Sequence, residues 1–239
     1  MYACFRATFC LLSLSIGIGR SESATPTTAD IAVYLKSDGS SSPAVVANMM
    51  RELGELMLSA GFHIEWGDWK KPSVSSDGAD LAVVVLRGTC SAPSPVEPTD
   101  QSRNMRVLAS TAVADHKILP FSWVDCTALS QFLRPSMAHE STLRRDYVYG
   151  RAMARLAGHE LYHILARTVE HTQAGVAKER FAIADLLAEH FQYEGEALFR
   201  MHSGQSAEIV LEPAISRSWA PTSTSHSRSG DDLLAGERY

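Results

Sequence analysis

The run His159-Glu160-Leu161-Tyr162-His163 holds the residue types best suited to chemistry in this 239-residue chain. Residues four apart lie on one face of a helix, so both histidines can direct a ring nitrogen to a common point. A metal ion there would lie about 2.0–2.1 Å from each nitrogen. Glu160 projects beside this point, where its carboxylate can hold and deprotonate a water that the cation makes more acidic. The spacing therefore predicts a metal site with a general base.

The helix that carries this run is predicted to begin between Ser141 and Asp146 and to end near Thr168. Gly158 costs such a helix about 1 kcal/mol relative to alanine, which close packing of the helix would offset. The two histidines fall on a different side from the apolar stripe, so the helix can pack on a sheet while its ligands face a cleft. That stripe consists of Met153, Ala157, Leu161 and Leu165.

A catalytic zinc site needs a third protein ligand. His171 follows His163 by eight residues, and a continuing helix would carry it about 12 Å away. The helix must therefore end near Thr168 and the chain must turn back. The alternative is a carboxylate from the following helix, Glu189 or Glu194. We expect His171, because histidine is the commonest metal ligand.

The run from Gly158 to His171 resembles the active-site helix of zincin metallopeptidases, with a third histidine similar to that of the metzincins. The metzincin pattern is HExxHxxGxxH. Ala166 stands where that pattern has glycine, and Val169 stands where it has the third histidine, so His171 takes this role only by displacement. The resemblance implies zinc-dependent hydrolysis of peptide bonds. Its site residues would be the zinc ligands His159, His163 and His171, with Glu160 as general base and then proton donor.

The resemblance also implies the fold class, α/β (α+β) with a mixed twisted sheet, a backing helix and an active-site helix. Substrate would then bind as an extended strand added to the edge of the sheet. The methionine turn of the metzincins would correspond to Met201, and Tyr193 or His190 would stabilise the oxyanion.

The pattern along the chain predicts strands and helices in an order compatible with this fold. Residues 80–87 are apolar enough for a central strand, and Asp115-His116 suits a hairpin turn. Residues 91–104, rich in proline and serine, indicate a long loop. The other expected strands are 29–36, 63–66, 107–114 and 118–124, and the other expected helices are 43–60, a short one before Pro135, and 182–198.

Three parts are expected along the chain. Residues 1–23 read as a signal peptide, although a buried helix or a retained membrane anchor is the alternative, and residues 24–212 as a zincin-like catalytic domain. Residues 213–239 read as a disordered tail.

Loss of the signal peptide would change the formal net charge from −5 to −6, which argues against a nucleic-acid partner. Cys90 and Cys126 would remain, as one disulfide or as two buried thiols.

These features together predict a secreted zinc metallopeptidase with a peptide or protein substrate, and no stable membrane association after signal removal. Two alternatives share the same ligands. One is an exported, non-catalytic zinc-binding or structural protein with a closed site, and the other is a zinc hydrolase that acts on a different amide. Catalytic sites keep one coordination position open, which distinguishes them from closed ones.

Overall fold

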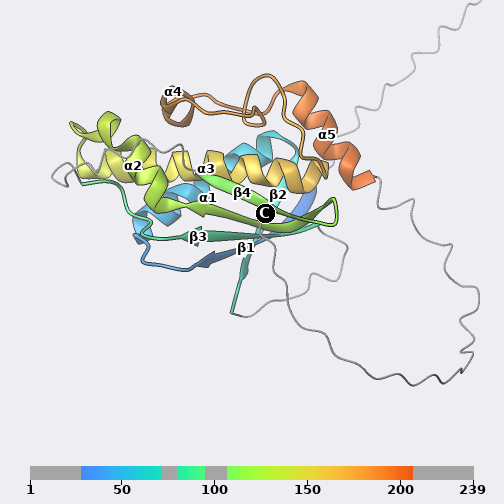
Figure 1. Ribbon diagram of the computed structural model, residues 1–239, viewed down its shortest axis with the longest axis horizontal. Helices are drawn as coiled ribbons and strands as arrows, with labels where there is room; N and C mark the ends of the chain where they lie inside the picture. The colour runs from blue at the N-terminus through green and yellow to red at the C-terminus, as the bar shows by residue number, and fades with distance from the viewer. Residues whose placement is uncertain (1–27, 71–79, 95–106, 207–239) are drawn as a thin grey trace, which may run out of the picture.

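The computed structural model describes residues 28–70, 80–94 and 107–206 (Figure 1). The predicted signal peptide (1–23), most of the predicted loop at 91–104 and the predicted tail (213–239) lie outside these ranges. Within them the chain forms one five-stranded sheet with helices packed against it. No helix in the described ranges has both the length and the apolar character required to cross a bilayer.

The sheet is mixed, as the sequence predicts. Its strands lie in the order β2-β1-β3-β5-β4, which puts β3 at the centre and β4 at an edge. β1, β2, β3 and β5 run parallel, and β4 runs antiparallel to β5. Asp115 and His116 have φ of 49° and 61°, the left-handed geometry of the predicted hairpin turn. The strand bounds are β1 Ala29–Ser37, β2 Phe62–Asp68, β3 Asp80–Arg87, β4 Ala109–Ala114 and β5 Lys117–Asp125.

Helix α3 is the central element of the fold. It lies between the sheet and the C-terminal segment (Figure 1), and every residue from Val148 to Leu165 is buried. A helix buried on all sides needs contacts around its whole circumference, which α1, the sheet and the C-terminal segment provide. The helix bounds are α1 Pro43–Ser59, α2 Cys126–Met137, α3 Thr142–Ala166, α4 Ile183–Leu187 and α5 Gly195–Ser206.

Local sequence signals set several of these bounds. Pro43 begins α1, and Ser141 begins α3 by accepting a hydrogen bond from the backbone N–H of Arg144 at 3.3 Å. Cys90, which follows β3, forms a disulfide with Cys126, the first residue of α2, so the predicted pairing is confirmed.

Two helix predictions are wrong. α2 does not end before Pro135 but contains it in its last turn. Proline has no backbone N–H and so removes one helical hydrogen bond, which costs little near the end of a helix. The predicted helix at 182–198 is instead two helices, α4 and α5, separated by residues 188–194. The break begins at Ala188, whose ψ of 153° is not helical, and its carbonyl accepts hydrogen bonds from Arg151 and Arg155 of α3.

Close contact between α1 and α3 depends on glycine. A Cβ on Gly158 would lie 2.8 Å from Cδ2 of Leu56, which explains this residue inside a helix. A Cβ on Gly150 would lie 2.7 Å from Cβ of Asn48 and 2.8 Å from the carbonyl oxygen of Val45. A Cβ at Gly150 would be harder to accommodate than one at Gly158, because it would meet a Cβ atom and a backbone oxygen, which do not move when a side chain rotates.

We therefore expect Gly150→Ala to destabilise the protein by about 1–3 kcal/mol, since overpacking outweighs the better helix propensity of alanine. Gly54→Ala in α1 is the matched control, because a Cβ there meets nothing within 4 Å. It should stabilise by up to about 1 kcal/mol. Urea denaturation measures both, and a Gly150→Ala variant at least as stable as the parent would contradict the packing described.

Candidate metal centre

Three histidines converge at the C-terminal end of α3. His159, His163 and His171 each offer one ring nitrogen, and these nitrogens lie within 4.8 Å of one another. The Nε2 atoms of His159 and His163 are 3.1 Å apart. Two nitrogens bound tetrahedrally to one zinc ion at about 2.0–2.1 Å would be separated by about 3.3 Å. The spacing of the histidine pair therefore fits a shared metal ion.

Backbone carbonyls fix the tautomer of both helical histidines. Nδ1 of His159 lies 2.8 Å from the carbonyl oxygen of Val176, and Nδ1 of His163 lies 2.8 Å from that of Thr168. A carbonyl oxygen can only accept, so each Nδ1 carries the hydrogen and each Nε2 presents a lone pair. Two lone pairs then face each other across 3.1 Å, an arrangement that a cation between them stabilises.

Burial keeps these histidines in the neutral form that binds metals. It lowers the pKa of His159 to about 4, against the hydrogen bond to Val176 and with the help of His163 and His171. Burial also lowers the pKa of His163. Neither ring is therefore protonated at neutral pH, so protons compete little with a metal ion there.

The third histidine returns to the site because α3 ends where the sequence predicts. α3 ends at Ala166, and Arg167 adopts the left-handed conformation with φ of 50°. The N–H of Thr168 then donates to the carbonyl of His163 at 3.3 Å, and this bond caps the helix. The chain reverses direction and brings the His171 ring to 4.8 Å from the His163 ring, centre to centre.

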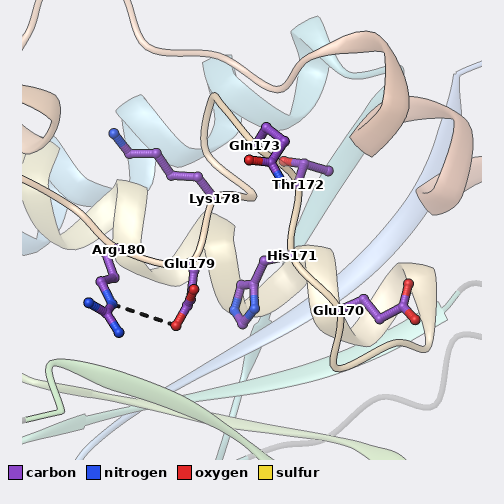
Figure 2. A pocket seen from close by; sticks show the side chains of 7 residues that line it. All are labelled: Glu170, His171, Thr172, Gln173, Lys178, Glu179 and Arg180. Atoms are coloured by element: carbon purple, nitrogen blue, oxygen red, sulfur yellow. Dashed lines mark ion pairs between the residues drawn. The ribbon is translucent and has the colours of Figure 1, made fainter.

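The predicted alternatives for the third ligand are not part of this group. Within residues 28–70, 80–94 and 107–206, the three histidines are the only group of three or more histidine, cysteine or carboxylate side chains that could hold a metal ion, and neither Glu189 nor Glu194 belongs to it. His171 is the most open of the three and borders a cavity of about 750 Å³. Figure 2 shows its imidazole pointing away from Thr172 and Gln173, toward the strands of the sheet. The cavity lining is Glu170, His171, Thr172, Gln173, Lys178, Glu179 and Arg180.

Glu160 lies on α3 beside the histidines and is 3% exposed. Its Oε2 accepts a hydrogen bond of 2.6 Å from the hydroxyl of Thr111, on the edge strand β4. Burial raises the pKa of Glu160 to about 7, although the Thr111 hydrogen bond acts in the opposite direction. A carboxyl group with this pKa can both accept and donate a proton near neutral pH.

A buried polar stripe runs along α3 and includes both helical ligands. Its members Arg151, Arg155, His159 and His163 recur at intervals of four residues. Each hydrogen-bonds to backbone carbonyls of one segment, residues 168–188, which runs back along the helix. Glu52 of α1 lies 3.3 Å from Arg151 and 3.5 Å from Arg155 and balances part of their charge. Sequence analysis missed the two arginines, although their four-residue spacing from His159 was visible.

Several other candidate residues have structural roles. Tyr193 donates its hydroxyl hydrogen to the carbonyl of Gly158 at 2.6 Å, so this hydrogen does not point to a site where it could stabilise an oxyanion. Tyr162 donates to the carbonyl of Glu170 at 3.1 Å and ties the loop to α3. His190 is exposed between α4 and α5. Met201 is buried within α5, so the predicted methionine turn is wrong: this methionine belongs to a helix.

Comparison with known proteins found no matching family, no similar curated protein and no similar solved structure. The likeness to zincins therefore depends on the residues and geometry of this chain.

We expect the protein to bind one equivalent of zinc or cobalt, and His171→Ala to weaken this binding by more than about 100-fold. Even residues that only orient a ligand contribute about 10- to 100-fold. Glu189→Ala, which removes the competing candidate, should leave the affinity unchanged. Elemental analysis and competition with a chelator provide the measurement. Loss of metal from the Glu189 variant and not from the His171 variant would assign the third position to the carboxylate.

The stripe also predicts a strong dependence of stability on Arg155, which is 1% exposed. Arg155→Met should cost about 3–5 kcal/mol, because it leaves Glu52 and two carbonyls with fewer partners in the interior. Arg144→Met, on the exposed first turn of the same helix, should cost less than about 1 kcal/mol. Thermal and chemical denaturation compare the two. If both variants lost similar free energy of unfolding, the buried arginine would contribute no more to stability than the exposed one.

Proposed function

We propose that this protein is a secreted zinc metallopeptidase of the zincin type that hydrolyses peptide bonds. The observation that carries the proposal is the pair of Nε2 atoms 3.1 Å apart, with His171 close to both rings. Imidazole donors suit zinc, and three histidines form a known catalytic zinc set.

The number of ligands favours a catalytic site over a closed one. Structural zinc sites have four protein ligands, whereas catalytic sites have three and leave one position for water or substrate. In the part of the chain that the structure describes, the histidine group contains three potential ligands. The most open of them, His171, borders a solvent-accessible cavity, so solvent reaches the proposed third ligand. Both features support the enzyme over the non-catalytic alternative.

Glu160 is the general base in this proposal. A zinc ion at the site supplies a Lewis acid that makes water more acidic and polarises the scissile carbonyl. Glu160 accepts a proton from the attacking water at its carboxylate and then donates it to the leaving amine. Its buried position and its pKa near 7 suit both steps. His159 and His163, held by backbone carbonyls, keep their rings oriented throughout.

The sheet supports a peptide as the substrate. Among the described residues β4 is an edge strand, and it contacts Glu160 through Thr111, so this edge of the sheet and the proposed catalytic residue are neighbours. An extended peptide can add to such an edge through main-chain hydrogen bonds. This arrangement favours a peptide over a small amide, because a small amide lacks the extended main chain that forms hydrogen bonds with a strand edge.

Glu160→Gln should retain stoichiometric zinc and lose at least about 10²- to 10⁴-fold in kcat, because the amide keeps the shape but cannot accept the proton. Glu65→Gln, an exposed position on β2, is the matched control and should retain full activity. The assay uses a mixed peptide library, with and without a chelator, and mass spectrometry of the products.

The three readings give different results in this assay. Chelator-sensitive cleavage that disappears in Glu160→Gln supports the peptidase. A parent protein that binds zinc through four protein ligands and cleaves nothing supports the closed, non-catalytic site. Zinc binding with hydrolysis of small amides but not of peptides supports the third reading. Equal cleavage by parent and Glu160→Gln would refute the mechanism.

A further inference from the structure

Thr111 is the side chain that connects the edge strand to the buried carboxylate. Its Oγ1 lies 2.6 Å from Oε2 of Glu160 and 3.2 Å from the backbone carbonyl oxygen of the same residue. The contact joins residues 49 positions apart in the chain. It is therefore a product of the tertiary fold rather than of local sequence.

The backbone of β4 is irregular at this position. The pairing of β4 with β5 is in register at Thr111 with Ser122 and shifts between Thr111 and Val113. Such irregularities increase the local twist and redirect side chains, and they are frequent beside active sites. Here the shift occurs where the strand meets Glu160 of α3, so the strand geometry and the position of the hydroxyl belong together.

On the basis of the proposed function, we propose that Thr111 is a positioning residue that holds the Glu160 carboxylate in one orientation. A threonine hydroxyl has one hydrogen to donate and two lone pairs to accept. When Glu160 is a carboxylate, the hydroxyl donates to Oε2.

The contact of Oγ1 with Oε2 is shorter than its contact with the backbone carbonyl, so the hydroxyl hydrogen is directed to the carboxylate. This hydrogen bond limits the rotation of the carboxyl group. Valine has the shape of threonine but neither donates nor accepts, and serine keeps the hydroxyl. These two substitutions therefore separate shape from hydrogen bonding.

We expect Thr111→Val to lower kcat by about 10- to 100-fold, the usual effect of removing a partner that orients a group at a metal site. KM should stay within about threefold of the parent and zinc content should not change, because neither substrate nor metal loses a contact. Thr111→Ser should restore kcat to within about threefold. Ser110→Ala, which removes the neighbouring hydroxyl on the same strand, a group that contacts the Thr111 carbonyl at 3.4 Å rather than Glu160, is the control and should match the parent.

Crystal structures of the parent, Thr111→Val and Thr111→Ser give a readout that does not depend on activity. The Glu160 carboxylate should keep its place in the serine variant and move or occupy two positions in the valine variant. An unchanged carboxylate position and unchanged kcat in Thr111→Val would overturn the positioning role while the peptidase stands. If the parent cleaves no peptide, the proposed function fails, and the carboxylate position alone decides whether Thr111 holds Glu160.

Discussion

The structure depends on one set of interactions, the hydrogen bonds between the polar stripe of α3 and the backbone of residues 168–188. Arg151, Arg155, His159 and His163 all donate to carbonyl oxygens of this segment. A segment with little regular structure has carbonyls that need partners when it packs on a buried helix. The stripe supplies these partners, so the segment can cover α3 without forming a long helix of its own.

The same interactions bring together the three histidines that could hold a metal ion. The loop that carries His171 also provides Val176 and Thr168, whose carbonyls orient the other two histidines. The position of the third ligand and the orientation of the first two are therefore coupled. The ion pair between Lys178 and Asp185, at 2.6 Å, joins this loop to the part of the segment that Arg155 holds. A metal ion that binds the folded site would stabilise the whole arrangement by linkage.

Local patterns in the sequence predicted the elements whose signals are local. The strand at 29–36, the apolar central strand at 80–87, the turn at Asp115-His116 and the helix start between Ser141 and Asp146 all correspond to observed features. The requirement that His171 return to the site also predicted the end of α3 correctly. Each of these inferences used residues within about one helix or one turn of each other.

The features that sequence analysis missed are long-range ones. The helix at 182–198 is interrupted at Ala188, whose carbonyl accepts hydrogen bonds from Arg151 and Arg155, more than thirty residues earlier. Thr111 contacts Glu160 only because the sheet brings β4 beside α3. Met201 has the spacing of a methionine turn, yet it packs inside α5, because spacing does not determine secondary structure. The contacts at Ala188 and at Thr111 join residues far apart in the chain, and local patterns do not predict them.

The buried ionisable residues of α3 fall into two groups, which differ in whether a counter-charge lies beside them. Burying ionisable groups is costly, and proteins keep them inside where partners compensate or function requires them. Glu52 partly compensates Arg151 and Arg155, so this pair is explained by the fold. His159, His163 and Glu160 are also buried, but their neighbours are backbone carbonyls and a threonine hydroxyl rather than a counter-charge. Neutral imidazoles with their lone pairs facing each other are donors that a divalent cation can bind, and together with His171 they form a group that could hold a metal ion.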